Sequence, residues 1–164
     1  IYGVSAFGLS NQTNLNRSES KLIIDNYYNS YPALKEFMTN QINFARENGF
    51  VQTILGRKRF LNDINSRNGM VRSSAERNAI NTPVQGSAAD IIKLSMIKIN
   101  KELKKHSLKS KLILQVHDEL VFDVPQEEVD LIKKIIIENM ENAYKLKVPL
   151  IVDLGIGNNW LEAH

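Results

Sequence analysis

Three consecutive polar residues, His117, Asp118 and Glu119, separate two apolar runs that are typical of buried strands. The tip of such a hairpin holds its side chains on a rigid frame at the edge of a sheet. Carboxylates there suit Mg²⁺, which takes oxygen ligands, usually one or two carboxylates together with substrate phosphates. Asp and Glu are also ordinary turn residues, so a purely structural turn is the alternative. The tip lacks the Gly and Asn that two-residue hairpins prefer, which favours a use for its side chains.

A second candidate set, Arg77, Asn81 and Gln85, is spaced at intervals of four residues. At about 100° per residue, each interval drifts by only about 40°, so the three side chains form one polar stripe on a helix. Guanidinium and amide groups donate hydrogen bonds, and minor-groove acceptors of duplex DNA recur with little regard to sequence. A solvated helix face is the alternative, although such faces usually carry Lys and Glu. Pro83 and Gly86 are expected to distort the helix near Gln85.

The elements that must position these residues follow from capping signals and hydrophobic spacing. Residues 4–9 resemble the end of a helix, and Asn16 with Glu19 forms a capping box that predicts a helix to about Asn29. Other expected elements are a helix over 32–49, a hairpin of 50–55 and 58–61, a helix over 127–146, and strands over 111–116, 120–124 and 149–156.

Two further helix starts flank Pro83. Ser73 with Glu76 matches a second capping box, and its helix is expected to end just before the proline, which disfavours the α conformation in the preceding residue. A new helix is then expected from Ser87 to about residue 105. Together, the expected helices and strands predict an α+β fold, with a small antiparallel sheet late in the chain and helices packed on one face. Alternation in the first late strand places Leu112, Leu114 and Val116 on one face, and Ile113, Gln115 and His117 on the other.

Composition sets the broad class. The chain has 164 residues, 43% of them hydrophobic, and a mean hydropathy of −0.27, which is typical of a soluble globular domain or a piece of a larger one. No apolar run approaches the roughly 18 residues of a membrane span, and no signal peptide is visible, so no membrane partner is expected. The absence of cysteine excludes disulfides and zinc–thiolate sites and favours a reducing, cytoplasmic location.

Charge is distributed unevenly along the chain. Residues 1–110 hold 16 Lys and Arg against 8 Asp and Glu, whereas residues 111–164 hold 5 against 10. The stretch 57–77 alone holds six Lys and Arg against Asp63 and Glu76. A basic first part indicates a polyanionic partner and an acidic second part indicates cations, while scattered solvated charge is the alternative.

Several motifs together resemble the family A DNA polymerases, the DNA polymerase I type. "QVHDELVFDV" resembles that family's motif C, "ERNAINTPVQGSAADIIK" the helix that cradles the primer–template junction, and "IYGVSAFGLS" the end of the fingers helix. "TILGRKRFL" and "VPLIVDLGIGNNW" are similar to a family hairpin and to its C-terminal strand and tail. The resemblance extends from end to end and implies the C-terminal part of a polymerase domain, with about residues 1–72 from the fingers and about residues 73–164 from the palm.

The resemblance implies roles for the motif C residues and a cofactor. Asp118 would be one of two catalytic aspartates that hold a pair of Mg²⁺ ions, and Glu119 an auxiliary carboxylate beside it. His117 would lie near the primer terminus. The implied reaction is attack of the primer 3′-hydroxyl on a deoxynucleoside triphosphate (dNTP), with release of pyrophosphate, in DNA replication or repair.

The resemblance also implies contacts with primer–template DNA and with dNTP. Arg77 and Gln85 would contact the minor groove at the junction, with Asn81 supporting them. Tyr2 would lie beside the nascent pair at the insertion site, and Gly3 would give the helix end room to move.

Departures from the family pattern limit what this chain does alone. The second catalytic aspartate and the Arg and Lys that bind triphosphate belong to motifs that this sequence does not contain, so the remainder of a polymerase chain is an expected partner and the chain alone is expected to be inactive. Val71 stands where a basic residue is expected, and Asn62 where proline is common. A non-catalytic duplex-DNA-binding module is the alternative function, and a metal-dependent nuclease a more distant one, because no second carboxylate cluster is evident.

Overall fold

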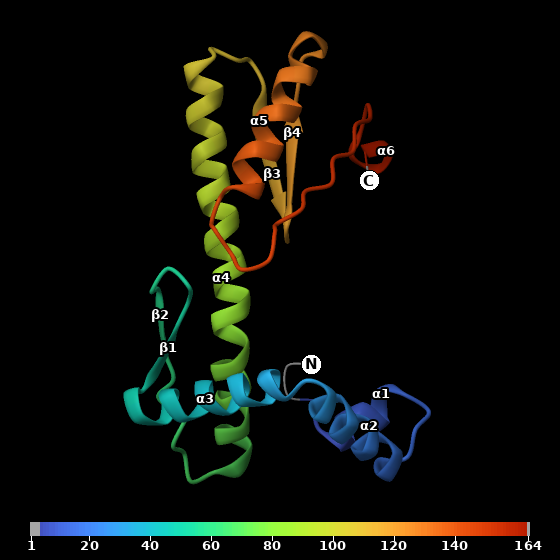
Figure 1. Cartoon of the computed structure of the whole chain (residues 1–164), viewed down its shortest axis with the longest axis vertical. Coiled ribbons are helices and arrows are strands. Elements are labelled where there is room, and N and C mark those ends of the chain that lie inside the picture. The colour runs from blue at the N-terminus through green and yellow to red at the C-terminus, as the bar shows by residue number, and fades with distance from the viewer. Residues whose placement is uncertain (1–3, 164) are drawn as a thin grey trace. The chain divides into compact units, whose positions relative to one another are not determined.

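The computed structural model describes residues 4–163, which form helices and two short antiparallel sheets. The elements are α1 (Ala6–Gln12), α2 (Arg17–Ser30), α3 (Pro32–Asn48), β1 (Phe50–Gln52), β2 (Lys58–Phe60), α4 (Gly69–Lys105), β3 (Lys111–Val116), β4 (Glu119–Asp123), the 3₁₀ turn η1 (Gln126–Glu128), α5 (Val129–Glu141) and α6 (Trp160–Ala163) (Figure 1). They belong to two compact units, the first up to Ser87 and the second from Ala88. The α+β class is therefore confirmed, and no helix in the described part of the chain has the length and apolar content needed to cross a membrane.

The first helices follow local capping rules. The Asn16 side chain accepts a hydrogen bond from the Glu19 N–H at 2.9 Å, and the Glu19 carboxylate accepts one from the Asn16 N–H at 2.8 Å, which confirms the capping box of α2. Helix α3 begins with Pro32 and ends at Gly49, whose φ of +76° is one that glycine adopts readily.

Helix α1 differs from the expected end of a longer helix. It begins at Ala6, and the Ser5 hydroxyl caps it by accepting a hydrogen bond from the Gly8 N–H at 3.0 Å. The side-chain cap satisfies a first-turn donor that a preceding helical turn would otherwise satisfy. Tyr2 and Gly3, the proposed nucleotide-binding residues, lie outside the described residues.

The β1–β2 hairpin packs beside α3 and the first part of α4. Phe50 pairs with Phe60 across the hairpin, and the ring of Phe50 also meets Phe44 of α3 at a centroid distance of 5.6 Å. Gly56, at φ +80°, supplies the left-handed residue of the turn. A buried cluster joins the hairpin, its flanks and both helices: Ala45, Val51, Leu61, Ile64, Ala75 and Ala79.

Helix α4 is continuous over 37 residues, with Pro83 inside it. The expected break before Pro83 and the new start at Ser87 are therefore wrong. The capping box at Ser73 is also wrong, because the helix begins at Gly69 and the Asn68 side chain accepts hydrogen bonds from the N–H groups of Met70 and Val71 at 3.0 and 3.4 Å.

The second unit is a hairpin and helix packed on the later part of α4, and Figure 1 shows the orange β4 and α5 beside the yellow end of that helix. Strands β3 and β4 pair antiparallel, with Leu112 opposite Phe122 but Leu114 opposite Val121. This irregularity at Ile113 breaks the expected strict alternation of faces. The core of the unit comprises Ile99, Leu103, Ile132, Ile135 and Ile136, with Leu120 and Phe122 packed against it.

The expected last strand over 149–156 is absent from the described residues, where this apolar run has no regular structure. Most of its side chains are instead exposed, with Ile151 at 79% and Ile156 at 54%. A strand needs a neighbour for its backbone hydrogen bonds, and in the described residues this run pairs with neither open edge of the two-stranded β3–β4 sheet. The sequence pattern is thus a poor guide here, because a near-continuous apolar run does not show whether a partner strand is available.

Candidate functional site

The first candidate site is the turn of the β3–β4 hairpin. Val116 pairs with Glu119, which leaves His117 and Asp118 as the two turn residues. His117 has φ +52°, in the left-handed region that non-glycine residues seldom occupy, and the Gln115 side-chain amide donates a hydrogen bond to its carbonyl at 3.1 Å. His117 and Asp118 are exposed, and Glu119 is half-buried at the start of β4. The turn therefore contains a residue in the left-handed region and presents Asp118 to solvent, and β4 begins at Glu119, one residue before the expected strand 120–124.

The hairpin that carries this turn is anchored at its other end by Glu128. One carboxylate oxygen accepts a hydrogen bond from the Lys109 N–H at 2.8 Å, and the other accepts from the N–H and the hydroxyl of Ser110 at 2.9 and 2.5 Å. These donors, the Lys109 N–H first, hold the pKa of Glu128 below its ordinary value. Glu128 thus fixes the chain that enters β3, a role that sequence reasoning missed because the residues are 18 or 19 positions apart.

The fit of the turn to Mg²⁺ is partial. Asp118 and Glu119 provide carboxylate oxygens, the donor type that Mg²⁺ prefers. Within residues 4–163, however, no three His, Cys, Asp or Glu side chains lie close enough together to hold a metal ion. The donor set matches one side of an open magnesium site whose other ligands come from water, substrate or another segment, and it does not match a closed structural metal site.

The second candidate site is the stripe Arg77, Asn81 and Gln85 on α4, in the first unit. Arg77 and Gln85 are exposed and Asn81 is half-buried. The Oδ1 atom of Asn81 is buried and has no hydrogen-bond partner among the described residues. The helix therefore brings the three side chains onto one continuous element, and only the middle one is turned partly into the protein.

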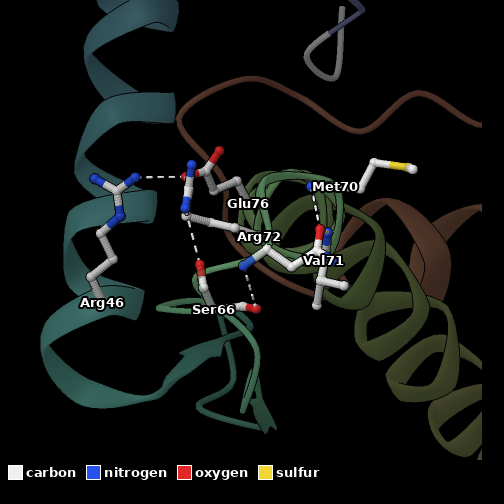
Figure 2. Close-up of polar contacts among 7 residues, drawn as sticks. Arg46, Ser66, Met70, Val71, Arg72 and Glu76 are labelled. Atoms are coloured by element: carbon white, nitrogen blue, oxygen red, sulfur yellow. Dashed lines mark hydrogen bonds and ion pairs between the residues drawn. The ribbon is translucent and has the colours of Figure 1, made fainter.

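A polar network holds the beginning of α4, directly before the stripe (Figure 2). Glu76 accepts a hydrogen bond from the Arg46 guanidinium of α3 at 2.6 Å, and the Arg72 side chain lies 3.9 Å from the same oxygen. Arg72 also donates to the Ser66 carbonyl at 3.0 Å. Glu76, which the sequence assigned to a capping box, instead ties α4 to α3 next to Arg77.

The basic stretch 57–77 divides into structural and exposed cations. Arg57 donates to the Gly86 carbonyl at 3.1 Å and Arg59 to the Thr82 hydroxyl at 3.1 Å, while Lys58 lies 4.3 Å from the centre of the Phe50 ring. Part of the charge that indicated a polyanionic partner therefore supports the fold.

Comparisons with known proteins bear on what these two sites do. The model of DNA polymerase family A matches residues 1–162. The chain is 51% identical over 162 residues to DNA polymerase I of Caldicellulosiruptor bescii and 49% identical over 163 residues to that of Lactococcus lactis subsp. lactis, in each case over 99% of this chain and 19% of the relative. The chain thus spans about a fifth of the length of the curated relatives it matches.

A solved structure is similar over the same residues. It is described as the POL domain of Pol1 from M. smegmatis in complex with DNA primer–template and dNTP. The match covers 99% of this chain and 29% of the solved chain, with 41% sequence identity and a TM-score of 0.96. The strained Asp118 turn and the polar stripe of α4 lie within the residues that both comparisons match. The chain belongs to DNA polymerase family A.

Proposed function

We propose that this chain is the segment of a DNA polymerase I-type enzyme that supplies a metal-binding carboxylate and a primer–template contact. The main support is its likeness, over 99% of its length, to a polymerase domain described with primer–template DNA and dNTP. The proposed reaction joins the primer 3′-hydroxyl oxygen to the dNTP phosphorus and releases pyrophosphate. DNA replication or repair as its setting, and a cytoplasmic location, are part of the proposal.

Asp118 carries the metal-binding part of the proposal. Its carboxylate projects from a two-residue turn, and Glu119 follows it at the start of β4, so the two would hold Mg²⁺ at the sheet edge. Bound Mg²⁺ supplies stabilisation of negative charge on the phosphoryl group and on the attacking and leaving oxygens. His117, whose unusual backbone shapes the turn, would lie near the primer terminus.

The stripe of α4 carries the DNA-binding part. Arg77 and Gln85 are exposed donors on a helix whose beginning is fixed to α3, so they would hold the minor groove without reading its sequence. Asn81, with a buried and unpaired Oδ1, would lie between them and support their arrangement. Tyr2 and Gly3 are proposed to contact the incoming nucleotide on the strength of the family resemblance alone.

A non-catalytic duplex-DNA-binding module is the second candidate for the chain by itself. One observation favours it: the described residues offer the polar stripe but lack a group of three metal ligands. The two proposals agree if the chain binds DNA alone and contributes to catalysis only within the longer polymerase.

The experiment compares Asp118→Asn with Glu119→Gln in the full-length polymerase. Asparagine keeps the shape of Asp118 but removes the charge that attracts Mg²⁺, so the single-turnover rate should fall by about a thousandfold or more. Glu119→Gln should lower it by about tenfold or less, and primer–template affinity should change little in either variant. Equal losses of rate in both would contradict the assignment of Asp118 as the main ligand.

A further inference from the structure

Helix α4 has an internal weak point next to Gln85. Pro83 has no N–H to donate to the carbonyl of Ala79, and its ring crowds that carbonyl, so a proline inside a helix usually causes a kink. Gln85 lies two residues beyond Pro83, whereas Arg77 lies six residues before it. The direction of the helix at the proline therefore decides where Gln85 points relative to Arg77.

The β1–β2 hairpin bonds to α4 on both sides of this point. Arg59 donates to the Thr82 hydroxyl at 3.1 Å, just before the proline, and Arg57 donates to the Gly86 carbonyl at 3.1 Å, just after it. The two guanidinium groups thus connect one hairpin to both helical segments that meet at Pro83.

Ser87 of α4 adds two further hydrogen bonds at the same place. Its hydroxyl accepts a hydrogen bond from the Ile54 N–H at 2.8 Å and donates one to the Pro83 carbonyl. A serine that bonds to the carbonyl four residues earlier adjusts the local course of a helix. The hairpin backbone and the proline are therefore linked through one hydroxyl.

A close packing contact completes the arrangement. Thr53 is buried, and its hydroxyl accepts a hydrogen bond from the Arg57 N–H at 3.2 Å within the turn. A Cβ atom on residue 86 would lie 2.6 Å from the Thr53 methyl carbon, closer than such atoms approach. Only glycine at position 86 lets the hairpin approach the helix so closely.

We infer that the turn 53–57, with Arg59, Gly86 and Ser87, is a bracket that fixes the course of α4 at Pro83 and thereby positions Gln85 against DNA. The inference rests on the proposed function. Arg57, Arg59 and Thr53 are positioning residues, since they act through Gln85 and need not touch DNA.

Gly86→Ala in the full-length polymerase tests the bracket most sharply. Alanine is the better helix former, so helix propensity alone predicts no loss. The clash with Thr53 should instead displace the hairpin or the helix and weaken primer–template binding about fivefold, the worth of one neutral hydrogen bond. Thr53→Ser removes the methyl group and retains the hydroxyl, so the double variant Thr53→Ser with Gly86→Ala should recover most of the affinity.

Gly69→Ala is the matched control. It makes the same substitution in the same helix, and its added Cβ meets nothing closer than the Arg72 guanidinium at 3.9 Å. Gly69→Ala should leave DNA affinity unchanged. An equal loss in Gly69→Ala, or no recovery in the double variant, would overturn the bracket. Arg59→Met, which breaks a contact between exposed side chains, provides a milder variant should Gly86→Ala fail to fold, and it should weaken binding in the same direction.

A base-specific readout separates positioning from general destabilisation. Purines of the duplex are replaced singly by 3-deaza analogues, which lack the minor-groove N3 acceptor. The unmodified enzyme should bind more weakly to duplexes that carry the analogue at a position contacted by Arg77 or Gln85. In Gln85→Ala, the analogue should no longer weaken binding at one of these positions, and we call such a weakening the sensitivity at that position. Gly86→Ala should lose the same sensitivity and retain the one that depends on Arg77. Retention of both would overturn the bracket, whereas no sensitivity in the unmodified enzyme would overturn the proposed minor-groove contact on which it rests.

Discussion

The two candidate sites are supported in different ways. The polar stripe of α4 lies on a helix fixed by a guanidinium–carboxylate pair at its beginning and by hairpin contacts around Pro83. The β3–β4 turn stands on a hairpin that is anchored by the core packed against Leu120 and Phe122 of β4 and, at the end far from the tip, by Glu128. The tip itself contains a residue at φ +52° and an exposed carboxylate.

This difference indicates how much of each site the chain supplies. The stripe has its donors and their supports within one unit. The turn offers Asp118 and Glu119, and among the described residues no further carboxylate completes a metal site. DNA contact is therefore expected to be a property of this chain, whereas catalysis is expected to need the longer polymerase.

The largest expected difference is between binding and chemistry in the isolated chain. It should bind duplex DNA and extend no primer, because a single pair of carboxylates cannot hold the metals and the triphosphate together. The measurement is a primer-extension assay with Mg²⁺ and dNTP beside a binding titration of the same preparation. Template-directed incorporation by the purified chain would contradict the distinction between the two sites.

The next effect concerns Arg77 in the full-length polymerase. A hydrogen bond from a charged donor contributes roughly 1.5–3 kcal/mol, so Arg77→Ala should weaken primer–template binding about tenfold to a hundredfold for every sequence alike. Binding across a salt series distinguishes base from phosphate contacts, because loss of one phosphate contact lowers the slope of the logarithm of the binding constant against that of the salt concentration by about one. An unchanged slope with weaker binding supports the minor-groove assignment. An unchanged affinity would mean that the stripe is a solvated helix face without DNA contacts.

The next effect concerns Asn81, the middle residue of the stripe. Its Oδ1 is buried without a partner in the described residues, and an unsatisfied buried acceptor costs about 1 kcal/mol or more. Asn81→Leu should therefore stabilise the chain by about 1 kcal/mol in chemical unfolding, while weakening DNA binding by the full-length enzyme. Asn65→Leu is the control and should destabilise, because the Asn65 amide donates to the Arg46 carbonyl at 3.1 Å. A destabilised Asn81→Leu would mean that the amide is satisfied in solution.

The smallest effect concerns the anchor of the hairpin. The backbone N–H of Lys109 and the other donors lower the pKa of Glu128 from its ordinary value near 4.5. A carboxyl group with a lowered folded-state pKa stabilises the fold above its ordinary pKa, and this contribution disappears as the pH falls through the folded-state pKa. The stability difference between the natural chain and Glu128→Gln should therefore be largest at neutral pH and shrink below about pH 4.5.

Unfolding midpoints measured from pH 7 to pH 3 check this expectation. Ser110→Ala removes the hydroxyl donor and should reduce the pH-dependent part of the difference. A difference that stays constant over the whole range would mean that Glu128 is not held as a carboxylate by these donors.

Local signals in the sequence predicted much of the fold. The Asn16–Glu19 capping box, the left-handed Gly49 and the β1–β2 hairpin are confirmed, because each depends on residues close in sequence. The same reasoning identified His117–Glu119 as an unusual turn and Arg77, Asn81 and Gln85 as one helix face. Their roles in metal and DNA binding stay predictions.

Longer-range contacts could not be predicted in this way. Pro83 indicated a helix break, yet contacts from residues 54, 57 and 59 accompany a continuous helix. Residues 149–156 have the pattern of a strand, but whether a strand forms depends on a neighbour that no local pattern reveals. The sequence assigned Glu76 to a capping box and gave Glu128 no role, because their partners lie 30 and 18 residues away.

One measurement tests most directly whether the two sites have separate functions, metal binding at the turn and DNA binding at the helix. Primer–template affinity and the single-turnover rate at saturating DNA are determined for the full-length polymerase, Asp118→Asn and Arg77→Ala. We expect Asp118→Asn to lose about a thousandfold or more in rate with nearly unchanged affinity, and Arg77→Ala to lose about tenfold or more in affinity with a smaller loss of rate at saturation. Parallel losses of rate and affinity in both variants would contradict the separation of a metal-binding turn from a DNA-binding helix.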